Sequence, residues 1–165
     1  MADAIAQRDH DTGVPEDERP SLGVLAPLLG FRMRRIHNHL TRSFSERLGD
    51  LALKPGGFSA LGLMAANPGM SQKMLSAELG QDKATVVALL DEMEGRGWAE
   101  RRRAVTDRRR HHLYITEAGE AALARMTREA SSNESRVVAA LTPDESATLL
   151  GLLDKIYHDC FPVED

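Results

Sequence analysis

Two short predicted helices joined by a glycine turn constrain this sequence more than any other feature. Ser71 is a favourable N-cap for the first helix, which covers about residues 72–79 and ends at Gly80. Asp82 caps the second helix, which covers about residues 83–95 and carries an apolar stripe along one side. The stripe consists of Val86, Leu89, Leu90 and Met93. Since the stripe must be buried, the opposite side of the second helix is expected to face outward.

An arginine-rich hairpin is predicted directly after the second helix. Residues 99–103 and 111–115 read as two strands joined by a turn around residues 106–107. Leu113 and Ile115 alternate with polar neighbours, as in a strand with one buried face. Helix, turn, helix and basic hairpin in this order form the layout of a winged helix-turn-helix, whose second helix fits the major groove of DNA.

Further helices are predicted on both sides of this motif. Apolar residues at three- and four-residue steps predict a long amphipathic helix from about residue 27 to residue 48. They are Leu29, Met33, Ile36, Leu40, Phe44 and Leu48. A proline in the first turn suits a helix over residues 55–66, and Thr116 is placed to cap a helix rich in alanine and glutamate. Residues 142–145 form a capping box that opens a last helix to about residue 159. The predicted fold is therefore mainly α, with a two-stranded β wing.

Charge is distributed unevenly along the chain. The net charge is −4 overall, which by itself argues against a nucleic-acid partner. Residues 96–112, however, hold seven arginines against Glu100 and Asp107, a local net charge of +5. A polyanion responds to the field within about 8–10 Å, not to the total charge of the protein. On charge alone, a DNA-binding surface and a solvated charged loop remain open alternatives.

The sequence also limits the other classes of function. Cys160 is the only cysteine, so neither an intrachain disulfide nor a cysteine-based zinc site is expected within one chain. The sequence lacks an apolar run near the roughly 20 residues of a membrane span and lacks a signal-peptide core, so we expect a cytoplasmic protein without a membrane partner. We find neither a convergent acid–base pair nor a nucleophile motif, and we predict a protein that is not an enzyme and needs no cofactor.

Candidate DNA contacts follow from the layout of the motif. The outward side of the second helix is poor in polar side chains that could bind bases. We therefore expect the wing and DNA shape to supply much of the affinity. Arginines on the first strand of the hairpin can neutralise phosphates, and Asp107 can orient an arginine at the tip that enters a narrow minor groove. The candidate DNA-binding residues are Ser71, Gln72, Lys83, Ala84, Thr85, Val87, Ala88, Arg101, Arg103, Asp107, Arg108, Arg109 and Arg110.

Three segments, residues 69–80, 82–98 and 107–119, closely resemble the multiple-antibiotic-resistance regulator (MarR) family. The resemblance implies a homodimer built from the first and last helices, which binds double-stranded DNA at a roughly palindromic operator. It also implies a small-molecule effector, often an aromatic acid or its coenzyme A thioester, and it makes Arg109 the wing residue in the minor groove. Val87 and Ala88 depart from the serine and arginine frequent in the family, so the operator contacts are expected to differ.

The resemblance also suggests a division of the chain and a candidate effector site. The expected parts are a flexible acidic tail (1–20), an N-terminal dimerisation helix (21–50), the winged helix-turn-helix lobe (51–116) and C-terminal dimerisation helices (117–165). The candidate effector-binding residues are Arg32, Met33, Arg35, His39, Phe58 and Met64. An arginine there can pair with the carboxylate of a ligand, although a surface or interface salt bridge with an acidic residue is the more ordinary role. The apolar members can instead be simple core residues.

Two alternative functions stay open at this point. Cys160 near the end of the last helix could make the regulator redox-responsive. Because the outward side of the second predicted helix is poor in polar groups, a winged-helix module that binds another protein is also possible. Against these alternatives, we predict a repressor that a small effector releases from its palindromic operator.

Overall fold

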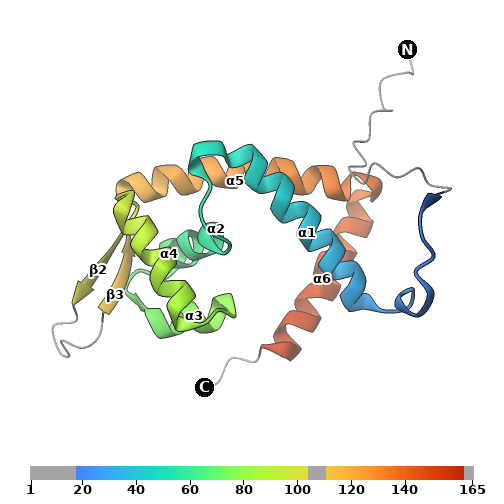
Figure 1. Cartoon of the computed structure of the whole chain (residues 1–165), viewed down its shortest axis with the longest axis horizontal. Coiled ribbons are helices and arrows are strands. Elements are labelled where there is room, and N and C mark those ends of the chain that lie inside the picture. The colour runs from blue at the N-terminus through green and yellow to red at the C-terminus, as the bar shows by residue number, and fades with distance from the viewer. Residues whose placement is uncertain (1–17, 104–110, 162–165) are drawn as a thin grey trace, which may run out of the picture. The chain divides into compact units, whose positions relative to one another are not determined.

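The computed structural model describes residues 18–103 and 111–161 (Figure 1). The chain divides into two compact units, Met1–His37 and Asn38–Asp165, which are described separately below. The expected acidic tail lies largely outside the described residues, as do Asp107, Arg108, Arg109 and Arg110 at the tip of the hairpin. In the described part of the chain, no helix is both long and apolar enough to cross a membrane.

The described elements are helical apart from one small sheet, as the sequence predicts. The helices are α1 (Leu29–Leu48), α2 (Gly57–Ala66), α3 (Gln72–Leu79), α4 (Lys83–Gly95), α5 (Glu117–Val137) and α6 (Pro143–Cys160). Short 3-10 helices are η2 (Gly23–Leu25), η3 (Gly49–Leu51) and η4 (Val138–Ala140), and the strands are β1 (Met70–Ser71), β2 (Ala99–Arg103) and β3 (His111–Ile115). The bounds of β2 and β3 are those predicted.

Four predicted helix caps are confirmed. The Ser71 Oγ accepts a hydrogen bond from the Met74 amide at the start of α3, and the Thr116 Oγ1 accepts one from the Gly119 amide at the start of α5. A carboxylate oxygen of Asp82 accepts hydrogen bonds from the amides of the second and third residues of α4. Thr142 and Glu145 form the reciprocal capping box of α6. Each cap satisfies amide groups that the first turn of a helix leaves without a partner.

The structure differs from the predicted elements in two places. The sheet has a third strand, because β1 pairs with β3 through Met70 opposite Leu113, and the strand order is β1-β3-β2 with antiparallel pairing. Helix α2 begins at Gly57 instead of residue 55. The preceding Gly56 has φ +90°, a conformation that favours glycine. A Cβ there would lie 2.7 Å from the side-chain nitrogen of Gln81.

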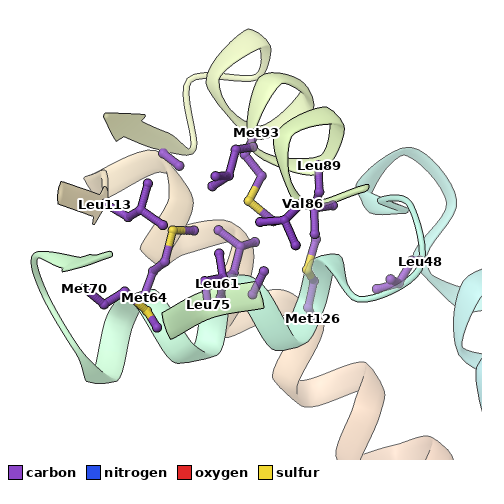
Figure 2. Close-up of a cluster of buried hydrophobic side chains, with 13 residues drawn as sticks. Leu48, Leu61, Met64, Met70, Leu75, Val86, Leu89, Met93, Leu113 and Met126 are labelled. Atoms are coloured by element: carbon purple, nitrogen blue, oxygen red, sulfur yellow. The ribbon is translucent and has the colours of Figure 1, made fainter. Parts of the chain in front are cut away.

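The hydrophobic core of the second unit is built mainly from α2, α3, α4, β3 and α5, and Leu48 of α1, Met70 of β1 and Ala99 of β2 also belong to it (Figure 2). Its largest fully buried side chains are Leu61, Met64, Leu75, Val86, Leu89, Leu90, Met93, Leu113 and Met126. The predicted stripe of α4 is therefore buried in full. Helix α5 approaches the start of β2 so closely that a Cβ at Gly119 would lie 2.0 Å from the Trp98 carbonyl oxygen. This packing fixes the hairpin against the helices.

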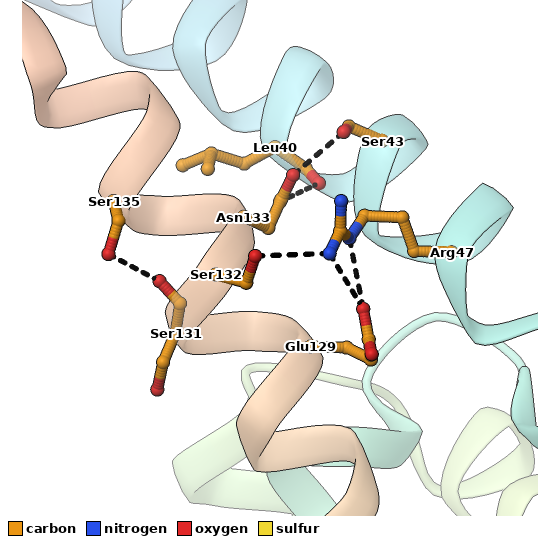
Figure 3. A network of polar contacts seen from close by, with 8 residues as sticks. All are labelled: Leu40, Ser43, Arg47, Glu129, Ser131, Ser132, Asn133 and Ser135. Carbon is orange, nitrogen blue, oxygen red and sulfur yellow. Dashed lines mark hydrogen bonds and ion pairs between the residues drawn. The ribbon is translucent and has the colours of Figure 1, made fainter.

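A polar network joins α5 to the second half of α1 (Figure 3). The Asn133 side chain is buried; its amide nitrogen donates to the Leu40 carbonyl at 3.0 Å, and its oxygen accepts from the Ser43 hydroxyl at 2.7 Å. Arg47 forms an ion pair with Glu129 at 2.8 Å. A buried amide that satisfies both of its polar atoms in this way fixes the register of the two helices.

Helix α6 is packed very differently from the core helices. None of its residues is buried, and large apolar side chains on it are exposed. They are Leu149, Leu150, Leu152, Leu153, Ile156 and Tyr157. The first unit likewise exposes apolar side chains, namely Leu22, Val24, Leu25, Leu28, Leu29, Met33 and Ile36. Apolar residues gathered in this number on an exposed surface indicate a site of association.

Candidate nucleic-acid interface

The N-terminal turn of α4 presents the first group of candidate DNA contacts. Lys83, Ala84 and Thr85 are exposed, and Val87 and Ala88 are half-buried. Burial of the opposite stripe in the core turns these residues outward, as predicted. The exposed amino group of Lys83 and the small neighbouring side chains leave this end of the helix accessible to a nucleic-acid backbone and to base edges.

The cap of α4 has its own electrostatics. The Thr85 hydroxyl donates to Asp82 Oδ2 at 2.7 Å, while Asp82 Oδ1 accepts from the Ala84 and Thr85 amides. These hydrogen bonds, led by that of the Thr85 hydroxyl, lower the pKa of the Asp82 carboxyl. The Asp82 carboxylate thus stabilises the helix while it occupies the position where a phosphate would otherwise meet free amides.

Ser71 and Gln72 lie at the start of α3. Both residues are half-buried, and the Ser71 hydroxyl is engaged as the helix cap. The side-chain nitrogen of Gln72 is buried and has no hydrogen-bond partner among the described residues. An unpaired buried amide is costly, and because this nitrogen is buried, it does not meet an outside acceptor in this conformation.

The arginines of β2 have different surroundings. Arg103 is exposed at the end of the strand. The Arg102 guanidinium lies over the Tyr114 ring at 4.3 Å and is hydrogen-bonded to Glu100, which raises the pKa of Arg102. Arg101, which the sequence places among the phosphate contacts, is instead bonded to Asp91 and Glu94 of α4. The three neighbouring arginines therefore do not form one uniform basic surface.

Sequence analysis missed a second arginine that joins separate elements. Arg96, at the end of α4, donates to the Asp50 and Ala52 carbonyl oxygens at 2.8 Å each and pairs with Glu92 at 2.9 Å. Its guanidinium also lies 4.8 Å from the centre of the Trp98 ring. Only its i,i+4 spacing from Glu92 is visible in the sequence, because its carbonyl partners are over forty residues away.

The candidate effector residues fall in both units. In the first unit, Arg32, Met33 and Arg35 are exposed, and the Arg32 guanidinium donates to the Ala26 carbonyl. In the second unit, His39 is exposed, and Phe58 is half-buried with its ring centre 5.3 Å from that of Phe44 in an edge-to-face contact. Met64 is fully buried in the core. Its position favours the simple packing role that the sequence left open.

The known proteins to which this chain is similar are transcriptional regulators. The family model described as the MarR family matches residues 53–110. A putative transcriptional regulatory protein for the hcr operon of Thauera aromatica is 33% identical over 137 residues, which cover 82% of each chain. The structure of the transcriptional repressor CouR bound to a 23-mer DNA duplex is 35% identical, with a TM-score of 0.76 over 84% of this chain and 99% of that one. CouR bound to p-coumaroyl-CoA is 33% identical, with a TM-score of 0.73 over 84% and 98% of the two chains.

Proposed function

The chain belongs to the MarR family of transcriptional regulators, and on that premise we propose that it is a homodimeric repressor released from a palindromic operator by a small effector. The observation that carries the proposal is the exposed N-terminal turn of α4, held outward by a closed core. In this proposal α4 is the recognition helix. It enters the major groove with Lys83, Thr85, Val87 and Ala88 near the bases and phosphates.

The hairpin supplies the second set of DNA contacts in this proposal. Arg103 neutralises a phosphate, and Asp107, Arg108, Arg109 and Arg110, which lie outside the described residues, form the wing tip. Arg109 enters the minor groove, where the potential is most negative. The similar repressor CouR was solved on a DNA duplex, which supports this mode of binding for the present chain.

Dimerisation is supported by the exposed apolar side chains of α6 and of the first unit. A two-fold dimer buries them and places two recognition helices about 34–36 Å apart, one turn of DNA. That spacing matches two half-sites of a palindrome.

The proposed effector is an aromatic acid or its coenzyme A thioester. Support comes from the similar repressor CouR, which was solved with p-coumaroyl-CoA. In the first unit, Arg32 and Arg35 are exposed and able to bind an acidic group, and the exposed Met33 offers apolar contact. In the second unit, His39 is exposed and Phe58 is half-buried. An effector lowers operator affinity only as far as it prefers the conformation that does not bind DNA.

DNA binding is tested by fluorescence anisotropy with duplexes selected by the protein from a random-sequence pool, over a range of salt concentrations. Arg109→Ala is expected to weaken binding and to reduce the slope of log affinity against log salt, by up to about 0.9 for each of the two subunits, because each loses one cationic contact to DNA. Wild-type protein that binds no duplex at low salt, or binds one without salt dependence, contradicts the proposal and favours a protein-interaction module.

The effector is tested by thermal shift with a panel of aromatic acids and their coenzyme A thioesters. A ligand of the native dimer raises its melting temperature by mass action and releases the selected duplex. The redox alternative is tested separately, by comparing wild type and Cys160→Ser for release of the selected duplex after treatment with hydrogen peroxide: release lost only in Cys160→Ser supports it, and any other result removes it.

A further inference from the structure

Arg101 of β2 is bonded to α4 through both its side chain and its backbone. Its Nη2 donates to Asp91 Oδ1 at 2.5 Å and to the Val87 carbonyl oxygen at 3.3 Å, and its Nη1 lies 3.6 Å from Glu94 Oε2. The Arg101 amide also donates to Glu94 Oε1 at 2.9 Å. Only 23% of the Arg101 side chain is exposed. These contacts, made by Asp91, Glu94 and Arg101, are called the α4–β2 clamp below.

The charge of the clamp argues against a phosphate contact at Arg101. One guanidinium faces two carboxylates, so the three side chains together carry a net charge of −1 at neutral pH. Such a group does not attract a phosphate. Arg103 lies two residues further along β2 on the same side of the strand and is exposed. Arg103 is therefore better placed than Arg101 to contact a phosphate, because its guanidinium is on an exposed residue.

We propose that Arg101 is a positioning residue that fixes the wing to the recognition helix and thereby sets the spacing of their DNA contacts. The inference rests on the proposed function, since it requires that α4 and the hairpin bind one duplex. Major-groove and minor-groove contacts lie on two elements that must match a fixed groove separation. The guanidinium donates to the Asp91 carboxylate and the Val87 carbonyl and is ion-paired with Glu94, and together with the backbone bond to Glu94 this ties β2 to α4.

The test compares Arg101→Lys, Arg101→Gln and Asp91→Asn with Arg103→Gln, the matched control. Binding is measured against a duplex selected by the wild-type protein and a scrambled duplex of the same composition, over a salt range. Lysine keeps the charge but lacks the fork. We therefore expect Arg101→Lys and Arg101→Gln each to lower affinity for the selected duplex about tenfold, with little effect on the scrambled one. Arg101→Gln is expected to leave the salt slope unchanged, whereas Arg103→Gln reduces it on both duplexes by about 0.9 for each of the two subunits, or about 1.8 for the dimer.

For Asp91→Asn, the clamp and simple electrostatics predict opposite changes in DNA affinity. Removing an exposed carboxylate near DNA should strengthen binding if charge alone matters. The clamp predicts weaker binding to the selected duplex, and little further loss when Arg101→Gln is added. Melting temperatures verify that each variant is folded at the assay temperature.

Three results would overturn the inference: Arg101→Gln reduces the salt slope, Arg101→Lys binds like wild type, or Asp91→Asn binds more tightly. Asp91 is 59% exposed, so its substitution remains informative even if a change at Arg101 unfolds the lobe. Failure of the proposed function is recognised separately, because wild-type protein and the Arg103 control would then bind no duplex at all.

Discussion

The lobe formed by α2 to α5 buries its apolar side chains, whereas helix α6 exposes them. In the lobe, Leu61 of α2, Leu75 of α3 and Leu89 of α4 are fully buried in one core. In α6, Leu150 is 62% exposed and no residue is buried. The apolar stripe of α4 finds its partner within the chain, whereas that of α6 does not. Periodicity alone shows that a helix has an apolar side, and only the fold shows whether the same chain covers it.

This difference assigns separate sources of stability to the two regions. The lobe can hold its recognition helix and hairpin in place through its own core. In the proposed dimer, the apolar side of helix α6 is buried by a second chain. Substitutions of the same kind should therefore act on folding in one region and on association in the other.

Leu89→Ala is expected to have the largest effect. The Leu89 side chain is fully buried, so its removal loses transfer free energy and leaves a cavity, together about 2–5 kcal/mol of the free energy of unfolding. The measurement is denaturant unfolding followed by circular dichroism at a fixed protein concentration. The difference from wild type should be similar at high and low protein concentration. A loss below about 1 kcal/mol would mean that the core adjusts freely, which contradicts the close packing of the lobe.

Leu150→Ala is expected to act mainly on association. Each copy loses apolar burial in the dimer, and two copies together cost about 2 kcal/mol, or roughly a 30-fold rise in the dimer dissociation constant. Sedimentation equilibrium measures this constant. The control is Met74→Ala on α3, since that side chain is 57% exposed but lies in the lobe. Equal effects of the two substitutions would remove the distinction between the regions.

The sequence predicted the parts of the fold that depend on near neighbours. The four helix caps, the bounds of β2 and β3 and the buried stripe of α4 follow from spacings of a few residues. Strand β1 was missed because two residues carry no periodicity, and its pairing with β3 depends on Met70 meeting Leu113. The start of α2 was missed because the position of the Gln81 side chain and the φ of Gly56 are set by the fold.

The candidate site was likewise predictable only where it depends on near neighbours in the sequence. The exposed turn of α4 could be inferred, because burial of one side of a helix determines the other. The roles of the hairpin arginines could not, since three identical residues in sequence have three different surroundings. Arg101 has its carboxylate partners on another element, at Asp91 and Glu94. Their i,i+3 spacing shows that they share a side of α4, but not that β2 lies against it.

The smallest expected effect concerns acid, and it compares the caps of α4 and α6. Hydrogen bonds lower the pKa of Asp82 below its ordinary 3.8, chiefly through the Thr85 hydroxyl, and that of Glu145 below its ordinary 4.5, chiefly through the Thr142 amide. A carboxyl whose pKa is depressed by folding stabilises the native state fully above its unfolded pKa, and this stabilisation is lost as pH falls through the folded pKa. The loss should therefore begin below about pH 4.5 at α6 and below about pH 3.8 at α4.

Carboxyl carbon NMR titration gives both midpoints directly, and each should lie below its ordinary value. Asp82→Asn and Glu145→Gln are matched controls, because asparagine can still cap a helix and glutamine can still complete a capping box, although neither titrates. Each variant should lose less stability than wild type as the pH is lowered through its own window. A midpoint at or above the ordinary value would show that the cap in question is open in solution. If that happened only at Glu145, the difference between the two regions would extend to their helix ends, with the cap of α6 depending, like its apolar side, on the second chain.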